Sequence, residues 1–376
     1  MSMRELTYQV SFNTPAFLGN AEQQAQWRTP PFKALLRQWW RVVKAPHPDV
    51  GYDYLKLLKL ENEIFGSAGD DDSGGRSKVQ LRLSGWDVGT LARVPNGEMV
   101  SHNEVPNKQV GANLYLGYGP IGGQTRNAID VKAPTQVFKI RCPDEHANDL
   151  QKAMQLAAWF GTLGSRSRNG WGSVEIACTD GAPMLGFGAL GAKDSIQGIV
   201  PTLSLPNCLS QEWRHAVGTN NEGVPAIWRL FKPGPKNEKG QTTLVNFASW
   251  EEAMKELARI KIAVRTAPYF KFQNGGNQGH PSPLPRHVLS YPTGSKHSVS
   301  ANNWGQSGRM ANQVLFKVHR RETGFVATIA HFPTRIPHHM TGRFQLPDQI
   351  AVWQEVHRLL DAERTNGLQR MKGTAA

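Results

Sequence analysis

Cysteine, acidic residues and long apolar runs are all scarce in this sequence. The 376 residues include three cysteines, Cys142, Cys178 and Cys208, which lie far apart and form no CxxC pair. Neither a disulfide framework nor a cysteine-rich zinc site is therefore supported. No run of about 18 apolar residues occurs, and the start MSMRELTYQV resembles neither a secretory signal nor a transit peptide. We expect a cytoplasmic protein that does not use a membrane.

The shortage of acidic residues gives the chain a strongly basic character. It has 43 Lys and Arg residues against 30 Asp and Glu residues, a formal net charge of +13, and 39% hydrophobic residues. These values are typical of a globular protein that binds a polyanion. The length is too great for one ordinary core and indicates two domains.

The charge is unevenly placed along the chain, because between residues 263 and 347 Glu322 is the only acid. Seven histidines and several aromatic residues are interleaved with the basic residues there, a mixture that suits contact with a nucleic-acid backbone combined with base stacking. A solvated basic surface is the alternative. The basic residues of this stretch are Arg265, Lys271, Arg286, Lys296, Arg309, Lys317, Arg320, Arg321, Arg335 and Arg343.

A glycine-rich segment, GTLGSRSRNGWGS at residues 161–173, follows a helical pattern and precedes the strand-like run 174–177. Glycine permits positive φ angles and close backbone approach, while Arg166 and Arg168 supply planar cations suited to phosphate. The segment therefore predicts an anion-binding loop. An ordinary turn with exposed arginines is the alternative.

A helix is predicted from Thr29, the expected N-cap, to about residue 44, with prolines in its first turn and further prolines after its end. Apolar residues at helical spacing should face a core: Phe32, Leu35, Leu36, Trp39, Trp40 and Val43. The adjoining face carries Lys33, Arg37, Arg41 and Lys44. RNA contact and plain solvation both fit this basic stripe.

The rest of the pattern predicts strands and helices in a repeated order. Strands are expected at 6–12, 78–83, 135–141, 174–177, 313–318 and 325–331, and helices after Asp144, after the capping box SWEE at 249–252, and at 348–363. Strand–helix–strand twice over is the order of a ferredoxin-like, RRM-like domain. We expect an α+β protein with two such domains in tandem and loop insertions, at 1–180 and 199–376, joined by a linker at 181–198.

At this point the residues resemble a known family. The stretch NTPAFLGNAEQQAQWRTPPFKALLRQWWR, residues 13–41, resembles the N-terminal signature of the large RAMP protein of type III-B CRISPR effector complexes, Cmr subunit one. A second part of that pattern is similar to FGS at residues 65–67 followed by RSKV at residues 76–79. The family's glycine-rich loop, G-x-R-x-R-x-G-x-G, is matched by residues 164–172. In the second half, HPSPL at 280–284 is similar to the family's Pro-Ser-Pro-Leu segment.

The resemblance implies two ferredoxin-like RAMP domains in a non-catalytic subunit of an antiviral, RNA-targeting complex. Such a subunit lies near the 3′ end of the guide RNA and contacts guide RNA, single-stranded target RNA and other RAMP subunits, with no metal or other cofactor. The residues expected to bind RNA are Asn20, Lys33, Arg37, Arg41, Arg76, Lys78, Gly164, Ser165, Arg166, Ser167, Arg168, Arg286, His287, Arg320 and Arg321.

Two other functions remain open on sequence grounds. The first is a RAMP endoribonuclease, which would use Asp70, Asp71 and Asp72 to bind Mg²⁺ or act on a 2′-hydroxyl, or a histidine such as His47 or His287 as general base. Adjacent acids beside Ser and Gly are also typical of a solvated loop. The second is a scaffold whose basic surface docks acidic neighbouring subunits.

Overall fold

The computed structural model describes residues 2–67, 75–105, 107–123, 126–179, 184–185, 199–272, 280–291, 297–299, 309–341 and 346–371. Helices and strands are mixed along the chain, which confirms the α+β class. The chain forms two compact units. Unit 1 contains residues 1–96, 116–201 and 317–322, and unit 2 contains 97–115, 202–316 and 323–376.

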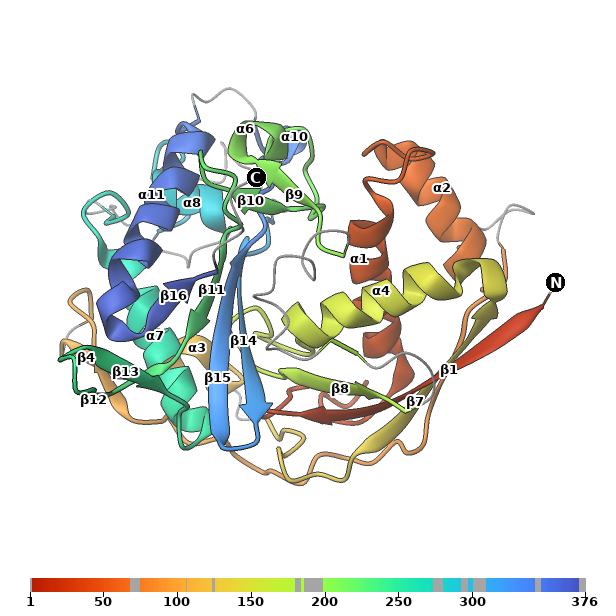
Figure 1. The fold of residues 1–376 in the computed structure, drawn as a ribbon, viewed down its shortest axis with the longest axis horizontal. Coiled ribbons are helices and arrows are strands. Elements are labelled where there is room, and N and C mark those ends of the chain that lie inside the picture. The colour runs from red at the N-terminus through yellow and green to blue at the C-terminus, as the bar shows by residue number, and fades with distance from the viewer. Residues whose placement is uncertain are drawn as a thin grey trace. The chain divides into compact units, whose positions relative to one another are not determined.

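Unit 1 is built on a four-stranded sheet in the order β2-β7-β1-β8, with antiparallel neighbours. Along β1 and β7 alternate residues are buried, such as Tyr8, Val10 and Phe138, as the period of a strand requires. Figure 1 shows two helices, α1 and α4, on one face of this sheet, where they pack against each other. The strands are β1 (Met3–Phe12), β2 (Gln80–Leu83), β7 (Gln136–Pro143) and β8 (Val174–Cys178).

Helix α1 (Thr29–Lys44) confirms the predicted apolar stripe, except that Val42 is buried where Val43 was expected. The prediction of Thr29 as N-cap is wrong: Arg28 is the cap residue, and no side chain caps the helix. Two prolines in the first turn need no such cap, because they lack the N–H group that it would satisfy. Trp39 and Trp40 are fully buried, and burial at about 25 cal/mol per Å² stabilises each on the order of 3–5 kcal/mol.

The second sheet helix, α4 (Asp144–Phe160), begins one residue earlier than predicted. Pro143 is its N-cap, and Asp144 is its first residue and pairs with Arg4 at 3.0 Å. A carboxylate there is favourable because it faces the positive end of the helix dipole. A further helix that was not predicted, α2 (Tyr54–Phe65), packs against α1.

Unit 2 repeats the order of elements found in unit 1. Its sheet has the order β14-β15-β11-β16 and follows strand, helix, strand, strand, helix, strand along the chain. Ser249 accepts a hydrogen bond from the Glu252 amide, and Asp348 accepts from the Ile350 amide, so both predicted helix starts are confirmed. The elements are β11 (Ile227–Leu230), α7 (Trp250–Thr266), β14 (Val314–Arg321), β15 (Gly324–His331), α11 (Gln349–Ala362) and β16 (Leu368–Arg370).

The remaining elements are short, and β3, β4, α3, β5 and β6 lie within the loop-rich stretch 85–133. Of the expected linker 181–198, only residues 184 and 185 are described. No helix in the described ranges combines the length and the apolar character needed to cross a membrane. The short elements are β3 (Met99–Ser101), β4 (Gln109–Gly111), α3 (Ala112–Gly117), β5 (Tyr118–Gly119), β6 (Ile121–Gly122), β9 (Thr202–Ser204), α6 (Leu205–Cys208), β10 (Val217–Thr219), β12 (Lys232–Lys236), β13 (Thr242–Val245), α8 (Pro285–Leu289), α10 (His338–Thr341) and the 3₁₀ helix Glu363–Asn366.

Candidate nucleic-acid interface

The glycine-rich loop, residues 161–173, joins the end of α4 to the start of β8. The segment after β1 holds it through backbone hydrogen bonds: the Gly172 amide donates to the Pro15 carbonyl and the Ser165 amide to the Phe17 carbonyl, each at 3.0 Å. Two stretches that carry the family resemblance, around residues 15 and 165, therefore form one structure.

Two glycines of the loop are required by its geometry. Gly172 has a φ of +61°, and a Cβ there would overlap the carbonyl oxygen of Leu163. Gly164 has a φ of +93°, and its Cβ would lie 2.6 Å from the carbonyl oxygen of Phe17. Both positions combine a left-handed backbone with close approach of another backbone, which only glycine tolerates.

The turn at residues 164–168 keeps several donors available. The backbone amides of Arg166, Ser167 and Arg168 have no acceptor among the described residues. Arg166 itself has a left-handed φ of +57° and is exposed, and its Nε donates to the Tyr118 carbonyl at 2.7 Å. Successive amides of this kind, next to a change of backbone hand, form a concave site for anions.

Arg168 is partly withdrawn from water without an acidic partner. Burial lowers the pKa of its guanidinium, and within the described ranges the side chain makes no hydrogen bond or ion pair. A cation that loses hydration without gaining a counter-ion is destabilising. An anion at this loop would supply the missing partner.

The base of the loop is formed by β14, through residues that belong to unit 1. The buried Lys317 donates from Nζ to the carbonyls of Ala157 and Ala158, at 2.9 and 2.6 Å, in the last turn of α4. The Val318 amide donates to Ser173 Oγ at 2.9 Å, at the other end of the loop. Burial lowers the pKa of Lys317 to about 7. This strand therefore fixes both ends of the glycine-rich loop.

The basic stripe of α1 is partly neutralised by α2. Arg37 Nε and Arg41 Nε each lie 2.6 Å from a carboxylate oxygen of Glu61, whose side chain is 2% exposed. Lys33 donates to the Phe65 carbonyl at the end of α2, and burial lowers its pKa. The stripe is thus neither simply solvated nor fully available for a phosphate backbone, because its cations also attach α2 to α1.

Other predicted contacts lie on the surface of unit 1. Arg76 and Lys78 are exposed just before β2, and Arg320 and Arg321 are exposed at the end of β14. Asn20 closes a tight turn with its own side chain and backbone. Together with the loop, these residues give unit 1 nearly all of the candidate RNA contacts.

Comparison with known proteins agrees with the motif resemblance over this part of the chain. The family model of the RAMP superfamily matches residues 10–175. The chain is therefore similar to the RAMP superfamily over these residues, the RAMP segment. The RAMP segment begins in β1 and ends in β8, so it contains α1, α4 and the whole glycine-rich loop.

Several solved structures are similar to this chain over all or part of its length. Cmr1 from Pyrococcus furiosus, in its apo form, is 13% identical, with 99% of each chain covered and a TM-score of 0.45. A chain of the type III-B Cmr-beta complex bound to cognate target RNA is 9% identical, with 94% of this chain and 99% of that chain covered and a TM-score of 0.47. A chain of a type IV-B CRISPR complex is 13% identical over 48% of this chain and 92% of its own, with a TM-score of 0.29. Among curated proteins, none matches the sequence.

Two of the predicted RNA contacts outside the RAMP segment, Arg286 and His287, lie in the interior of unit 2. Arg286 is 5% exposed, forms a two-pronged ion pair with Glu104, and stacks on Phe272 at 4.1 Å. His287 is fully buried; its Nδ1 accepts from the Leu284 amide, so its Nε2–H donates to the His297 carbonyl. Burial lowers the pKa of His287 to about 4. Both side chains are occupied internally, and we do not retain them as RNA contacts.

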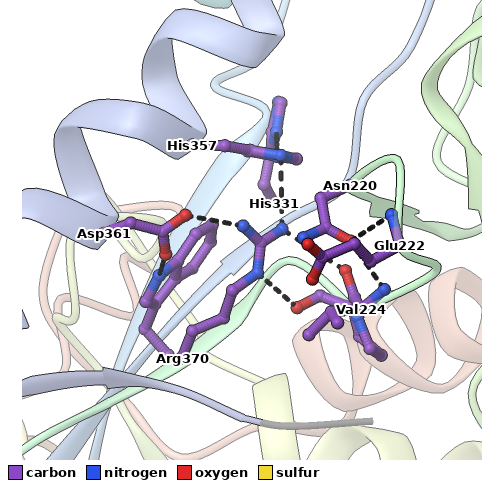
Figure 2. A network of polar contacts seen from close by, with 9 residues as sticks. Asn220, Glu222, Val224, His331, His357, Asp361 and Arg370 are labelled. Carbon is purple, nitrogen blue, oxygen red and sulfur yellow. Dashed lines mark hydrogen bonds and ion pairs between the residues drawn. The ribbon is translucent and has the colours of Figure 1, made fainter. Parts of the chain in front are cut away.

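A buried histidine pair in unit 2 gave no signal in the sequence. Figure 2 shows His331 and His357 next to Arg370, which pairs with Asp361 at 2.8 Å. Because arginine only donates, His357 Nδ1 must accept from Arg370 at 3.3 Å. His357 Nε2–H then donates to His331 Nδ1 at 2.9 Å, and the remaining His331 N–H has no acceptor within the described chain. Both rings are buried, which keeps them from reaching an external substrate.

The structure describes some of the residues that the nuclease hypothesis names and not others. Asp70, Asp71 and Asp72 lie outside the described residues. His47 is exposed after α1, with Nδ1 at 3.1 Å from an Asp49 oxygen. Within the described ranges, no group of three or more His, Cys, Asp or Glu side chains is placed to hold a metal ion.

Proposed function

We propose that this protein is a non-catalytic, RNA-binding subunit of a type III CRISPR ribonucleoprotein, related to Cmr subunit one and acting in antiviral defence. It contacts the guide RNA near its 3′ end and the single-stranded target RNA, works with other RAMP subunits in the cytoplasm, and requires no cofactor. The RAMP match over residues 10–175 and the motifs around residues 13–41 and 164–172 support this proposal.

The observation that carries the proposal is the arrangement at residues 164–168. Three backbone amides without acceptors in the described chain, an exposed Arg166 and a partly buried Arg168 without a counter-ion converge in one short turn. Such a turn can bind the phosphate groups of RNA whatever the base sequence is. Base pairing between guide and target would supply the sequence recognition. Arg76, Lys78, Arg320 and Arg321 extend the basic surface of unit 1 and are proposed as further backbone contacts.

Several of the residues predicted to bind RNA contribute less to binding in this proposal than the turn at residues 164–168. Arg37 and Arg41 offer RNA only those N–H groups that Glu61 leaves unused, and Lys33 already donates to a helix end. Asn20, Gly164, Ser165 and Ser167 would act mainly by shaping the two turns.

We further propose that the chain consists of two ferredoxin-like RAMP domains, 1–180 and 199–376, joined at 181–198. The support is the order of elements: numbering the four main strands of each unit along the chain, both sheets have the order 2-3-1-4. Each proposed domain also carries residues of the other compact unit: 97–115 in the first, and 199–201 and 317–322 in the second.

The test is a salt titration of RNA binding by the purified full chain. Fluorescence anisotropy with a labelled guide-like single-stranded RNA should give a log affinity that falls with log salt by about 0.7 for each phosphate neutralised. Changing Arg166 and Arg168 together to alanine should weaken binding and reduce this slope by about 1.4. Changing Lys236 and Lys239, two exposed lysines near the β12–β13 turn, removes the same charge and should leave both quantities unchanged. Full affinity in the arginine variant would refute the loop assignment.

The same preparation distinguishes the two competing functions. Ultraviolet crosslinking to the guide RNA should occur for an RNA-binding subunit and be absent for a scaffold that binds only acidic proteins. Labelled RNA should stay intact with and without Mg²⁺. Cleavage that disappears when Asp70, Asp71 and Asp72 are changed to asparagine would establish the nuclease instead.

A further inference from the structure

Tyr118 is an aromatic side chain that the fold leaves in solvent beside the glycine-rich loop. It is 66% exposed, more than any other aromatic side chain in the described ranges. It begins β5, which pairs with β6 two residues later. A tyrosine has a large apolar ring with a polar hydroxyl at its end, which suits it to a contact surface; its position beside the loop makes this ring a candidate for such a contact.

The loop fixes the position of this ring through its neighbours. Arg166 Nε donates to the Tyr118 carbonyl at 2.7 Å. Asn169 Nδ2 donates to the Leu116 carbonyl at 2.8 Å, and a Cβ on Gly117 would lie 3.0 Å from the Trp171 ring nitrogen. Two hydrogen bonds and one close approach therefore hold the backbone of residues 116–118 against the loop, so Tyr118 and the loop arginine belong to the same part of the structure.

The guanidinium of Arg166 is oriented by this attachment. Its Nη2 would lie 3.6 Å from a Cβ on Gly119, a residue with a φ of +112°, so the group lies over the backbone that follows the ring. Nε is used by the Tyr118 carbonyl, while the two terminal nitrogens have no acceptor among the described residues. Those terminal N–H groups match the two oxygens of one phosphate.

We propose that Tyr118 stacks on a base of single-stranded RNA while Arg166 binds the adjoining phosphate, so that the pair holds one nucleotide. This inference rests on the proposed RNA-binding function and adds a contact that depends on the base rather than on charge. An aromatic platform next to a backbone cation is the usual means of holding single strands without reading their sequence. Tyr118 gave no signal in the sequence, because it lies outside both the basic stretch and the glycine-rich loop.

Stacking and charge contacts are separated by their dependence on salt. Changing Tyr118 to alanine should weaken binding of the labelled RNA about tenfold, the effect typical of one stacked base, and leave the salt slope unchanged. Changing it to phenylalanine should preserve affinity, whereas leucine, which is apolar but lacks a ring, should behave like alanine. Changing Arg166 to alanine should instead reduce the slope by about 0.7. Tyr54, an exposed tyrosine in the first turn of α2, provides the matched control, and its alanine variant should bind like the wild type.

The outcomes distinguish this inference from the function on which it rests. If the wild type binds RNA with a steep salt dependence and the alanine variant of Tyr118 binds equally well, Tyr118 is not a stacking platform. A loss of binding to a partner subunit with unchanged RNA affinity would also overturn it, because the ring would then be a protein contact. If the wild type does not bind RNA at any salt concentration, the proposed function itself fails.

Discussion

Changing Lys317 to methionine removes a buried ammonium group that joins β14 to the end of α4. In the folded chain its pKa is about 7, because burial disfavours the charged form. In the unfolded chain its pKa returns to the ordinary value of 10.5. Between these values the unfolded state binds a proton that the folded state lacks, so stability rises with pH by about 1.4 kcal/mol per unit. Below pH 7 the amine is charged in both states, and the contribution is constant and least favourable.

The expected magnitude follows from that interval. Between pH 7 and pH 9 the wild type should gain about 2 kcal/mol relative to the methionine variant, because half of the folded chains already hold a neutral amine at pH 7. The energy that the variant loses because two helix-end carbonyls lack their donor does not change with pH. Urea unfolding of both proteins at pH 7, 8 and 9 measures the difference. Changing Lys317 to arginine keeps the charge at every pH, so that variant should also fail to gain stability as pH rises.

A control and a refuting result are available. Changing the exposed Lys78 to methionine should leave the pH dependence as it is in the wild type. If the wild type and the methionine variant of Lys317 show parallel pH profiles from 7 to 9, Lys317 does not titrate in this range, and the reasoning that burial lowers its pKa is wrong.

Three further predictions concern the loop and the interior of unit 2. Changing Gly172 to alanine should reduce RNA affinity to that of the double arginine variant in the anisotropy assay, because a Cβ overlaps the Leu163 carbonyl; normal affinity would contradict the loop geometry. Changing Glu104 to glutamine should lower the free energy of unfolding by about 3 kcal/mol, since a buried arginine loses its counter-ion, with RNA affinity unchanged; a loss of affinity would place this pair at the interface. Acidification below pH 6.5 should destabilise the chain by about 3 kcal/mol per pH unit, because His287 and His331, with pKa values of about 4 and 3, bind protons mainly after unfolding; urea midpoints that stay constant from pH 6.5 to 4.5 would contradict this.

Helix starts and buried helix faces were predicted well where the contacts that determine them join residues close in sequence. The spacing from Phe32 to Trp40 fixes which side of α1 is buried, and the box that begins at Ser249 satisfies amides within one turn. Asp348 acts over two and three residues in the same way. Such features depend only on neighbours in sequence, so they can be predicted without knowledge of the rest of the fold.

The surroundings of several predicted RNA-binding residues depend on partners that are distant in sequence. Arg286 pairs with Glu104, 182 residues away, so a basic residue that seemed available for RNA proved to be internal. Arg37 and Arg41 meet Glu61 because α2 returns along α1, and that helix was not predicted. Charge in a sequence therefore predicts the class of ligand for the whole chain, but burial by distant segments decides which cations can reach it.

The place of residues 317–322 in unit 1 bears on how the protein is made. The glycine-rich loop at 161–173 leaves the ribosome well before the strand that supplies Lys317 and Val318 to its two ends. A nascent chain that stops near residue 200 therefore lacks both donors, and its loop has an incomplete base. Synthesis has to pass residue 318 of 376 before both donors are present. We expect RNA binding through this loop to begin only then, so that truncated chains would not occupy guide RNA in place of the finished subunit.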